Sequence, residues 1–122
     1  MSAIDVDSLV AIDVHTHVEV SAVDGCGALS PELEEAANEY FGVVDRHRPA
    51  VGEMAAYYRE RNMAAIVFTV DSRTTMGVPP VPIDEIAEGA AANADVLIAF
   101  GSVDPHMGRA AVREVERQAD EL

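Results

Sequence analysis

The stretch Leu9-Val-Ala-Ile-Asp-Val-His-Thr-His-Val18 decides how the rest of the chain is interpreted. Its apolar run predicts a β-strand over residues 9–14, and His15 and His17 follow directly. Alternate side chains of a strand share a face, and a rise of ~3.3 Å per residue starts the two imidazoles ~7 Å apart. Both rings can then lean onto one ion, and neutral imidazole is a good ligand for zinc and related divalent metals. The spacing therefore predicts half of a metal site. The alternative is a pair of structural histidines that cap the strand through backbone hydrogen bonds.

Asp13 interrupts the apolar run two residues before His15. We expect its side chain on the face opposite the two histidines, so direct ligation beside them is disfavoured. Its predicted role is a buried support that accepts a hydrogen bond from a neighbouring strand end or from a ligand imidazole, which fixes the orientation of a ligand ring. Glu19 is a weaker candidate, because a residue at that position more often belongs to the following loop.

Two further apolar runs predict parallel strands near residues 64–70 and 96–103. All three runs are apolar on both faces, which is typical of strands in a covered parallel sheet. Amphipathic stripes with helical spacing follow the Ser30-Pro31 cap and recur near residues 51–58, 83–91 and 112–122. The alternation predicts an α/β fold with right-handed crossovers. We expect residues 1–122 to form a single partial domain with a helical insert at about 21–50.

Composition excludes several classes of function. The chain of 122 residues has a net charge of -14, and its eight basic residues are all arginine. Such acidity disfavours binding to nucleic acids and to anionic membranes, because phosphate is repelled. The single cysteine, Cys26, rules out an intrachain disulfide. No apolar run approaches the ~20 residues of a membrane-spanning helix, so we expect a cytoplasmic protein.

Polar residues follow the second and third predicted strands. Arg73 is a candidate substrate-binding residue, because its guanidinium can pair with a carboxylate through two parallel hydrogen bonds. The alternative is a solvated loop arginine paired with Asp71. Asp104 is expected to cap the helix that begins near Gly108. His106 follows the third predicted strand and could point into a pocket there, although an ordinary loop histidine is the favoured interpretation. His47 is expected on the surface, and Tyr57 and Tyr58 are expected to be core or packing residues.

Three segments in order carry a family resemblance: residues 12–18 (IDVHTHV), 65–72 (AIVFTVDS) and 99–106 (AFGSVDPH). The chain resembles the start of the amidohydrolase-related family often labelled amidohydrolase 2, which includes aminocarboxymuconate-semialdehyde and resorcylate-type decarboxylases. The resemblance implies the first three strand–helix units of a (β/α)8 TIM barrel, with chemistry at the carboxyl ends of the strands. It implies that His15 and His17 are metal ligands. The further ligands of the family, a histidine and an aspartate, come from later strands.

The resemblance implies a metal-dependent hydrolase or non-oxidative decarboxylase that acts on a small carboxylic acid. The expected cofactor is a divalent metal, zinc or manganese, which activates water or polarises a substrate carbonyl or carboxylate. A metal phosphoesterase can also begin with His-x-His on a first strand, although the later segments resemble that group less. The alternative of another class is a truncated, catalytically silent fragment that acts only by association with a missing half or with itself. Exposed strand edges favour a homo-oligomer in either case.

Overall fold

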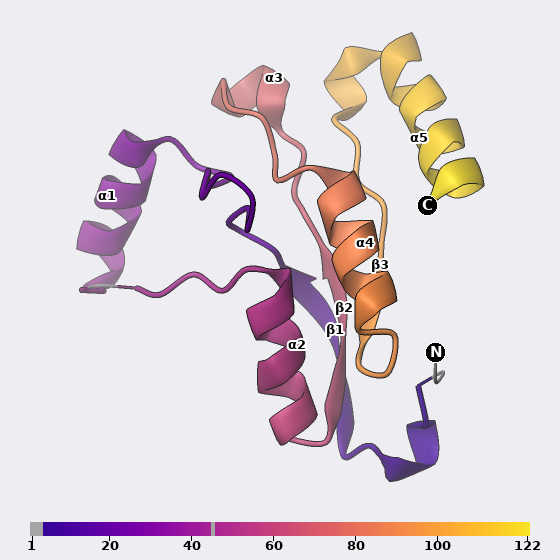
Figure 1. Ribbon diagram of the computed structural model, residues 1–122. Helices are drawn as coiled ribbons and strands as arrows, with labels where there is room; N and C mark the ends of the chain where they lie inside the picture. Colours follow the sequence, from indigo (N-terminus) through magenta and orange to yellow (C-terminus); the bar gives the residue numbers. More distant parts are fainter. Residues whose placement is uncertain (1–3, 45) are drawn as a thin grey trace.

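A parallel three-stranded sheet organises the protein, as seen in a computed structural model that describes residues 4–44 and 46–122 (Figure 1). The strands are β1 (Ala11–His17), β2 (Met63–Phe68) and β3 (Leu97–Ala99), paired in chain order. The helices are α1 (Pro31–Phe41), α2 (Val51–Glu60), α3 (Arg73–Met76), α4 (Ile83–Ala92) and α5 (Arg109–Glu121), with 3-10 turns at Val6–Ser8 and Pro105–Met107. The predicted α/β organisation with parallel strands is therefore confirmed.

The strand boundaries differ from the predicted ones in an informative way. β1 continues through His17, so the two histidines lie within the strand and do not follow it. β3 ends at Ala99, well before the predicted end at residue 103. The physical reason lies in its partner: the last β2–β3 pair is Val67 with Ala99, and β2 itself ends at Phe68. Beyond this point the backbone N–H and carbonyl of Ser102 bond the Gln118 side chain of α5, at 3.0 and 2.9 Å.

The long helices form where the apolar stripes predict them. α1 begins after Ser30, whose hydroxyl accepts a hydrogen bond from the backbone N–H of Leu33, and it ends at Gly42 with a left-handed φ of 64°. This helix lies in the predicted insert at about 21–50, of which residue 45 lies outside the described residues. The short helix α3 was not expected from the sequence. Among the described residues, no helix is both long and apolar enough to cross a membrane.

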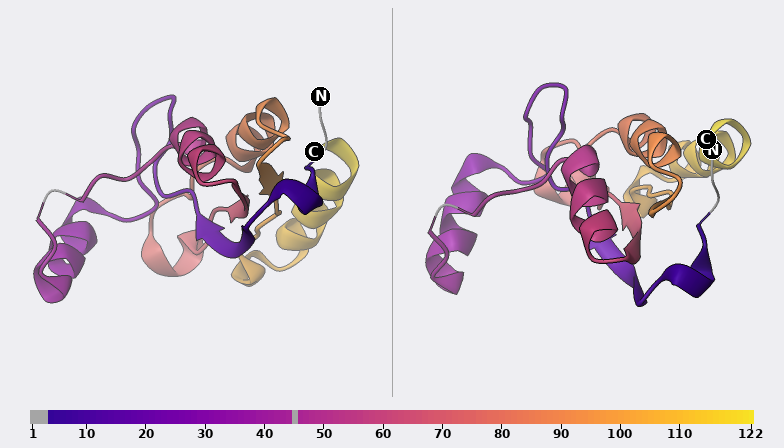
Figure 2. Two further views of the ribbon diagram at one scale, coloured as in Figure 1. Left: turned by 90° about the horizontal axis from the view of Figure 1, so that it is seen from below. Right: turned by 60° about the horizontal axis from the view of Figure 1, so that its bottom comes forward.

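One face of the sheet is packed against α2 and α4, which lie on the same side of it in Figures 1 and 2. Gly89 of α4 permits the two helices to approach closely, because a Cβ at this position would lie 2.4 Å from a methyl carbon of Val51. The core consists mainly of alanine and branched aliphatic side chains together with one methionine and one tyrosine: Val18, Val51, Met54, Ala55, Tyr58, Ala65, Val67, Val81, Ile86, Ala90, Val96 and Leu97.

The prediction that the strands are covered on both faces is wrong for the described residues. Val14 is 68% exposed, and Ile12, Ile98 and Phe100 also remain substantially exposed. The reason is that the helices packed on the sheet, α2 and α4, share one side of it. The second face is open, and it carries the two histidines.

Candidate functional site

His15 and His17 lie side by side near the carboxyl end of β1. Their Nε2 atoms are 3.1 Å apart, and the ring centroids are separated by 5.0 Å. The Phe68 ring lies against both imidazoles, at centroid distances of 5.4 and 4.7 Å. Both histidines are exposed to solvent. The structure thus brings together the two residues for which the sequence predicts a common ligand.

A break in strand register determines how this end of β1 is oriented. Asp13 pairs with Ala65 and Thr16 with Val67, so three steps along β1 match two along β2. One extra residue of this kind is characteristic of a β-bulge and reverses the alternation of faces. Alternation alone would place Asp13 on the face of His15 and His17. The irregularity instead places Asp13 with Ala65 on the helix-covered face. The expected face is therefore correct, but it results from the extra residue in β1 and not from two-residue alternation.

Two side chains bond the backbone groups around this irregularity. The Thr16 hydroxyl donates to the carbonyl oxygen of Ile66 at 2.8 Å. Asp13 Oδ1 accepts from the backbone N–H of His15 at 3.1 Å. Asp13 is partly buried, and in this contact it bonds the backbone of His15, whereas the sequence predicted a contact with a neighbouring strand end or a ligand imidazole.

Tyr58 supplies the second hydrogen bond of the Asp13 carboxylate, a contact that the sequence analysis missed. Its hydroxyl donates to Asp13 Oδ2 at 2.9 Å from the inner face of α2. Burial, and secondarily the hydrogen bond to Asp13, raises the pKa of Tyr58 to about 12, so the hydroxyl stays protonated at neutral pH. A tyrosine in the buried stripe of a helix needs a partner for its hydroxyl, and that requirement was the available signal.

The geometry of the histidine pair fits a shared metal ion. Zinc–nitrogen bonds of 2.0–2.1 Å in a tetrahedral site place two ligand nitrogens about 3.3 Å apart, close to the 3.1 Å between the Nε2 atoms. The same separation fits a hydrogen bond between neutral rings, in which one Nε2 carries the proton. Among the described residues, no group of three or more histidine, cysteine or acidic side chains is placed to hold a metal. The described residues thus offer two candidate ligands at this position, His15 and His17.

Glu19 does not extend the pair in this arrangement. Its carboxylate lies 3.4 Å from the Arg46 guanidinium and 3.6 Å from that of Arg48. His47 lies against Glu53 at 3.1 Å on an exposed surface. Cys26 is an exposed loop residue.

Arg73 forms a two-pronged ion pair with Asp71 just beyond β2. Its Nε donates to Asp71 Oδ1 at 2.9 Å and its Nη2 donates to Oδ2 at 2.7 Å, while the carboxylate itself is buried. The hydrogen bonds to Asp71 raise the pKa of the guanidinium. The pairing with Asp71 is the alternative that the sequence left open for this arginine. It does not by itself exclude a substrate contact, because the Arg73 side chain is 44% exposed.

The cleft beside Arg73 is separate from the histidine pair. It has a volume of about 480 Å³, and its mixed lining includes the carboxylates of Asp71, Asp104 and Glu114, whereas neither histidine lines it. Asp104 is buried and accepts hydrogen bonds from the backbone N–H groups of His106 (2.9 Å) and Thr74 (2.7 Å). Hydrogen bonding by Thr74, first through its side chain and then through its backbone, lowers the pKa of Asp104. The prediction that Asp104 caps the helix near Gly108 is wrong: α5 follows Gly108 without a side-chain cap, and Asp104 instead caps the intervening turn Pro105–Met107 and bonds the start of α3.

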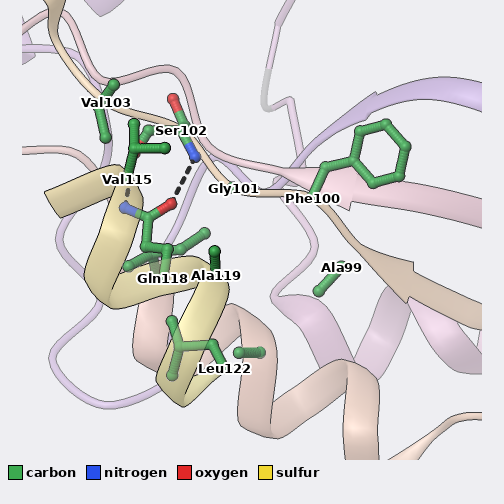
Figure 3. Close-up of a pocket in the computed structure, with 11 residues that line it drawn as sticks. Ala99, Phe100, Gly101, Ser102, Val103, Val115, Gln118, Ala119 and Leu122 are labelled. Atoms are coloured by element: carbon green, nitrogen blue, oxygen red, sulfur yellow. Dashed lines mark hydrogen bonds between the residues drawn. The ribbon is translucent and has the colours of Figure 1, made fainter. Parts of the chain in front are cut away.

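A second, apolar groove lies between β3, α4 and α5 (Figure 3). Its volume is about 360 Å³, and its lining includes Phe100, Val115 and Leu122, each about half exposed. Figure 3 shows Gln118 turned toward Ser102 at one side of the groove, where the two residues are hydrogen-bonded. The histidines do not line this groove either.

Comparison with known proteins gives no match to a protein-family model, a curated protein or a solved structure. The resemblance to amidohydrolase-related proteins therefore rests on the three sequence segments.

Proposed function

We propose that this chain is part of a metal-dependent enzyme, a hydrolase or non-oxidative decarboxylase for a small carboxylic acid, in which His15 and His17 hold zinc or manganese. The observation that carries the proposal is the 3.1 Å separation of the two Nε2 atoms on the open face of a parallel sheet. Two exposed imidazoles at that separation need little rearrangement to share an ion.

The arrangement of layers supports an origin in a (β/α)8 barrel. In such a barrel the helices lie outside the parallel strands, and the active site is built at the carboxyl ends of those strands. Here α2 and α4 lie on one side of the sheet, and the histidines lie at the carboxyl end of β1 on the other side. This arrangement of layers is compatible with one sector of a barrel wall.

The chemistry proposed for the site divides between the metal and the chain. A bound divalent ion activates water or polarises a carbonyl or carboxylate. His15 and His17 hold the ion as neutral imidazoles, and Phe68 restricts the tilt of both rings through its contacts with them. The remaining ligands come from groups outside the described residues or from water and substrate.

Arg73 is the proposed contact for the substrate carboxylate. Two of its guanidinium nitrogens, Nε and Nη2, are held by Asp71, so a substrate would meet the exposed side that this ion pair leaves. Planar guanidinium recognises a carboxylate best through two parallel hydrogen bonds. A productive contact therefore requires Arg73 to share or exchange its present partner.

The proposal is tested by zinc titration of the metal-free protein with a competing chromophoric chelator. We expect one zinc ion per chain in the wild type and in the control His47→Ala, whose imidazole lies on an exposed surface against Glu53. His15→Ala and His17→Ala should each weaken binding at least tenfold, because each removes one of two ligands. Unchanged affinity in both variants would overturn the proposal.

A second candidate function is assembly without catalysis. The open face of the sheet and the apolar groove beside β3 expose Val14, Ile98 and Phe100, which favours association with a second copy or a complementary chain. In this second case, analytical ultracentrifugation should show a homo-oligomer, and activity assays of the same material should show no turnover. A monomer across the micromolar range would contradict the assembly role.

A further inference from the structure

We infer that Tyr58 is a positioning residue for the proposed metal site and acts on His15 through Asp13. The inference rests on the proposed function, because it concerns the geometry of the same two imidazoles. It adds a residue from a different element, α2, which lies on the other side of the sheet from the histidines.

A continuous chain of contacts links the helix to the histidine. The Tyr58 hydroxyl donates to one oxygen of the Asp13 carboxylate at 2.9 Å. The other oxygen accepts from the backbone N–H of His15 at 3.1 Å. One carboxylate therefore connects a buried helix side chain to the backbone of a candidate ligand.

The link lies where β1 departs from regular pairing. The irregularity falls between Asp13 and Thr16, and His15 is inside it. Regular ladder hydrogen bonds do not fix the backbone at such a position, so another acceptor has to. Asp13 supplies that acceptor, but a carboxylate held by a single hydrogen bond can still rotate about its χ2 angle. The hydroxyl of Tyr58 occupies the second oxygen and stops that rotation.

The consequence for the metal site is geometric. A ligand constellation performs well only when its members are held within about 0.5 Å of the productive arrangement. The direction of the His15 imidazole depends on the backbone to which it is attached, and that backbone is held by the Asp13 carboxylate. Loss of supporting contacts around metal ligands typically reduces metal affinity by about 10–100-fold.

The chain offers a matched control in the adjacent residue. Tyr58 is buried, whereas Tyr57 is 52% exposed. The Arg61 guanidinium lies 3.6 Å from the centre of the Tyr57 ring, and a phenylalanine ring preserves that cation–π contact. Tyr58→Phe and Tyr57→Phe therefore delete one hydroxyl each, while only the first removes a contact with Asp13.

The test combines zinc affinity with exchange of the His15 amide proton, measured by NMR on the full chain without metal. We expect Tyr58→Phe to weaken zinc binding about tenfold and to accelerate exchange of the His15 amide. Tyr57→Phe should change neither. If Tyr58→Phe fails to fold, Asp13→Ala tests the same link from the other side, with the same expected results.

The possible failures are distinguishable. If His15→Ala abolishes zinc binding but Tyr58→Phe binds as the wild type does, the positioning role is overturned and the proposed function stands. Equal His15 amide exchange in Tyr58→Phe and Tyr57→Phe also overturns the positioning role. If the wild type itself binds no zinc, the proposed function fails and the positioning role fails with it.

Discussion

The two faces of the sheet differ in chemistry as much as in coverage. The face beneath α2 and α4 carries Ala65 and Val67, which are fully buried. The open face carries His15, His17 and Phe68, all of them at least partly accessible. Close helix packing requires small side chains, whereas ligand binding requires polar groups that remain reachable. The residues that stabilise the fold and the candidate metal ligands thus lie on opposite faces of the same sheet.

The same substitution on each face gives the largest expected contrast. Ile86 is fully buried among the helices and strands of the covered layer, whereas Ile12 is 37% exposed. Ile86→Ala should reduce the free energy of unfolding by about 2–5 kcal/mol, the cost of removing a buried branched side chain and leaving a cavity. Ile12→Ala should cost about 1 kcal/mol or less, because less apolar surface is lost.

Urea unfolding followed by circular dichroism measures both isoleucine variants. Equal losses would contradict the difference between the two faces, because they would mean that a partner covers the second face in solution. A concentration-dependent loss in Ile12→Ala would support the assembly role.

Close contact between α2 and α4 provides the next largest effect. Gly89→Ala places a Cβ 2.4 Å from a Val51 methyl carbon, so we expect a loss of about 1–3 kcal/mol from overpacking. The double variant with Val51→Ala should recover part of that loss. Gly52→Ala is the matched control: a Cβ there meets nothing within 4 Å, and stability should rise by up to about 1 kcal/mol through better helix propensity. Thermal unfolding of the four proteins checks this expectation.

Removal of the Arg73 side chain tests whether the cleft beside Arg73 and the histidine pair are independent of each other. Arg73→Ala leaves the buried Asp71 carboxylate without its two-pronged partner, and we expect a loss of roughly 1 kcal/mol, because Arg73 is partly solvated. Zinc affinity should stay at the wild-type value, since the cleft beside Arg73 does not include the histidines. A change in zinc affinity would show coupling between the two regions.

The smallest predicted effect depends on pH. Hydrogen bonds, first from Arg117 and then from Gln118, lower the pKa of Glu114 from its ordinary value of 4.5 to about 2. A carboxyl group with a lowered pKa stabilises the folded state above its unfolded pKa, and this contribution disappears as the pH falls from about 4.5 to 2. Glu114→Gln should cost less than about 1 kcal/mol at pH 7, because the side chain is partly exposed, and nothing below pH 2.

Urea titrations at several pH values measure this difference, with Glu116→Gln on the same helix as the control. A difference between wild type and Glu114→Gln that persists unchanged at pH 2 would show that lost packing, and not charge, is responsible.

Patterns within a single segment were enough to predict the strands, the long helices and the proximity of His15 to His17. Contacts between distant segments were not predictable in the same way. The irregularity in β1 depends on its pairing with β2, about 50 residues later along the chain, and the early end of β3 follows the end of β2 at Phe68. The Tyr58–Asp13 contact likewise needs the packing of α2 on the sheet. Periodicity indicates which face a residue prefers, but it does not reveal where a strand contains an extra residue relative to its partner.

The irregular stretch of β1 also bears on how the molecule meets its neighbours. β1 is an edge strand, and an edge with evenly spaced amides and carbonyls is a template on which another chain can add. Between Asp13 and Thr16 that even spacing is lost, and an irregular strand edge of this kind pairs poorly with another strand. We therefore expect intermolecular β-sheet growth to begin at β3, so that the imidazole pair stays clear of aggregation.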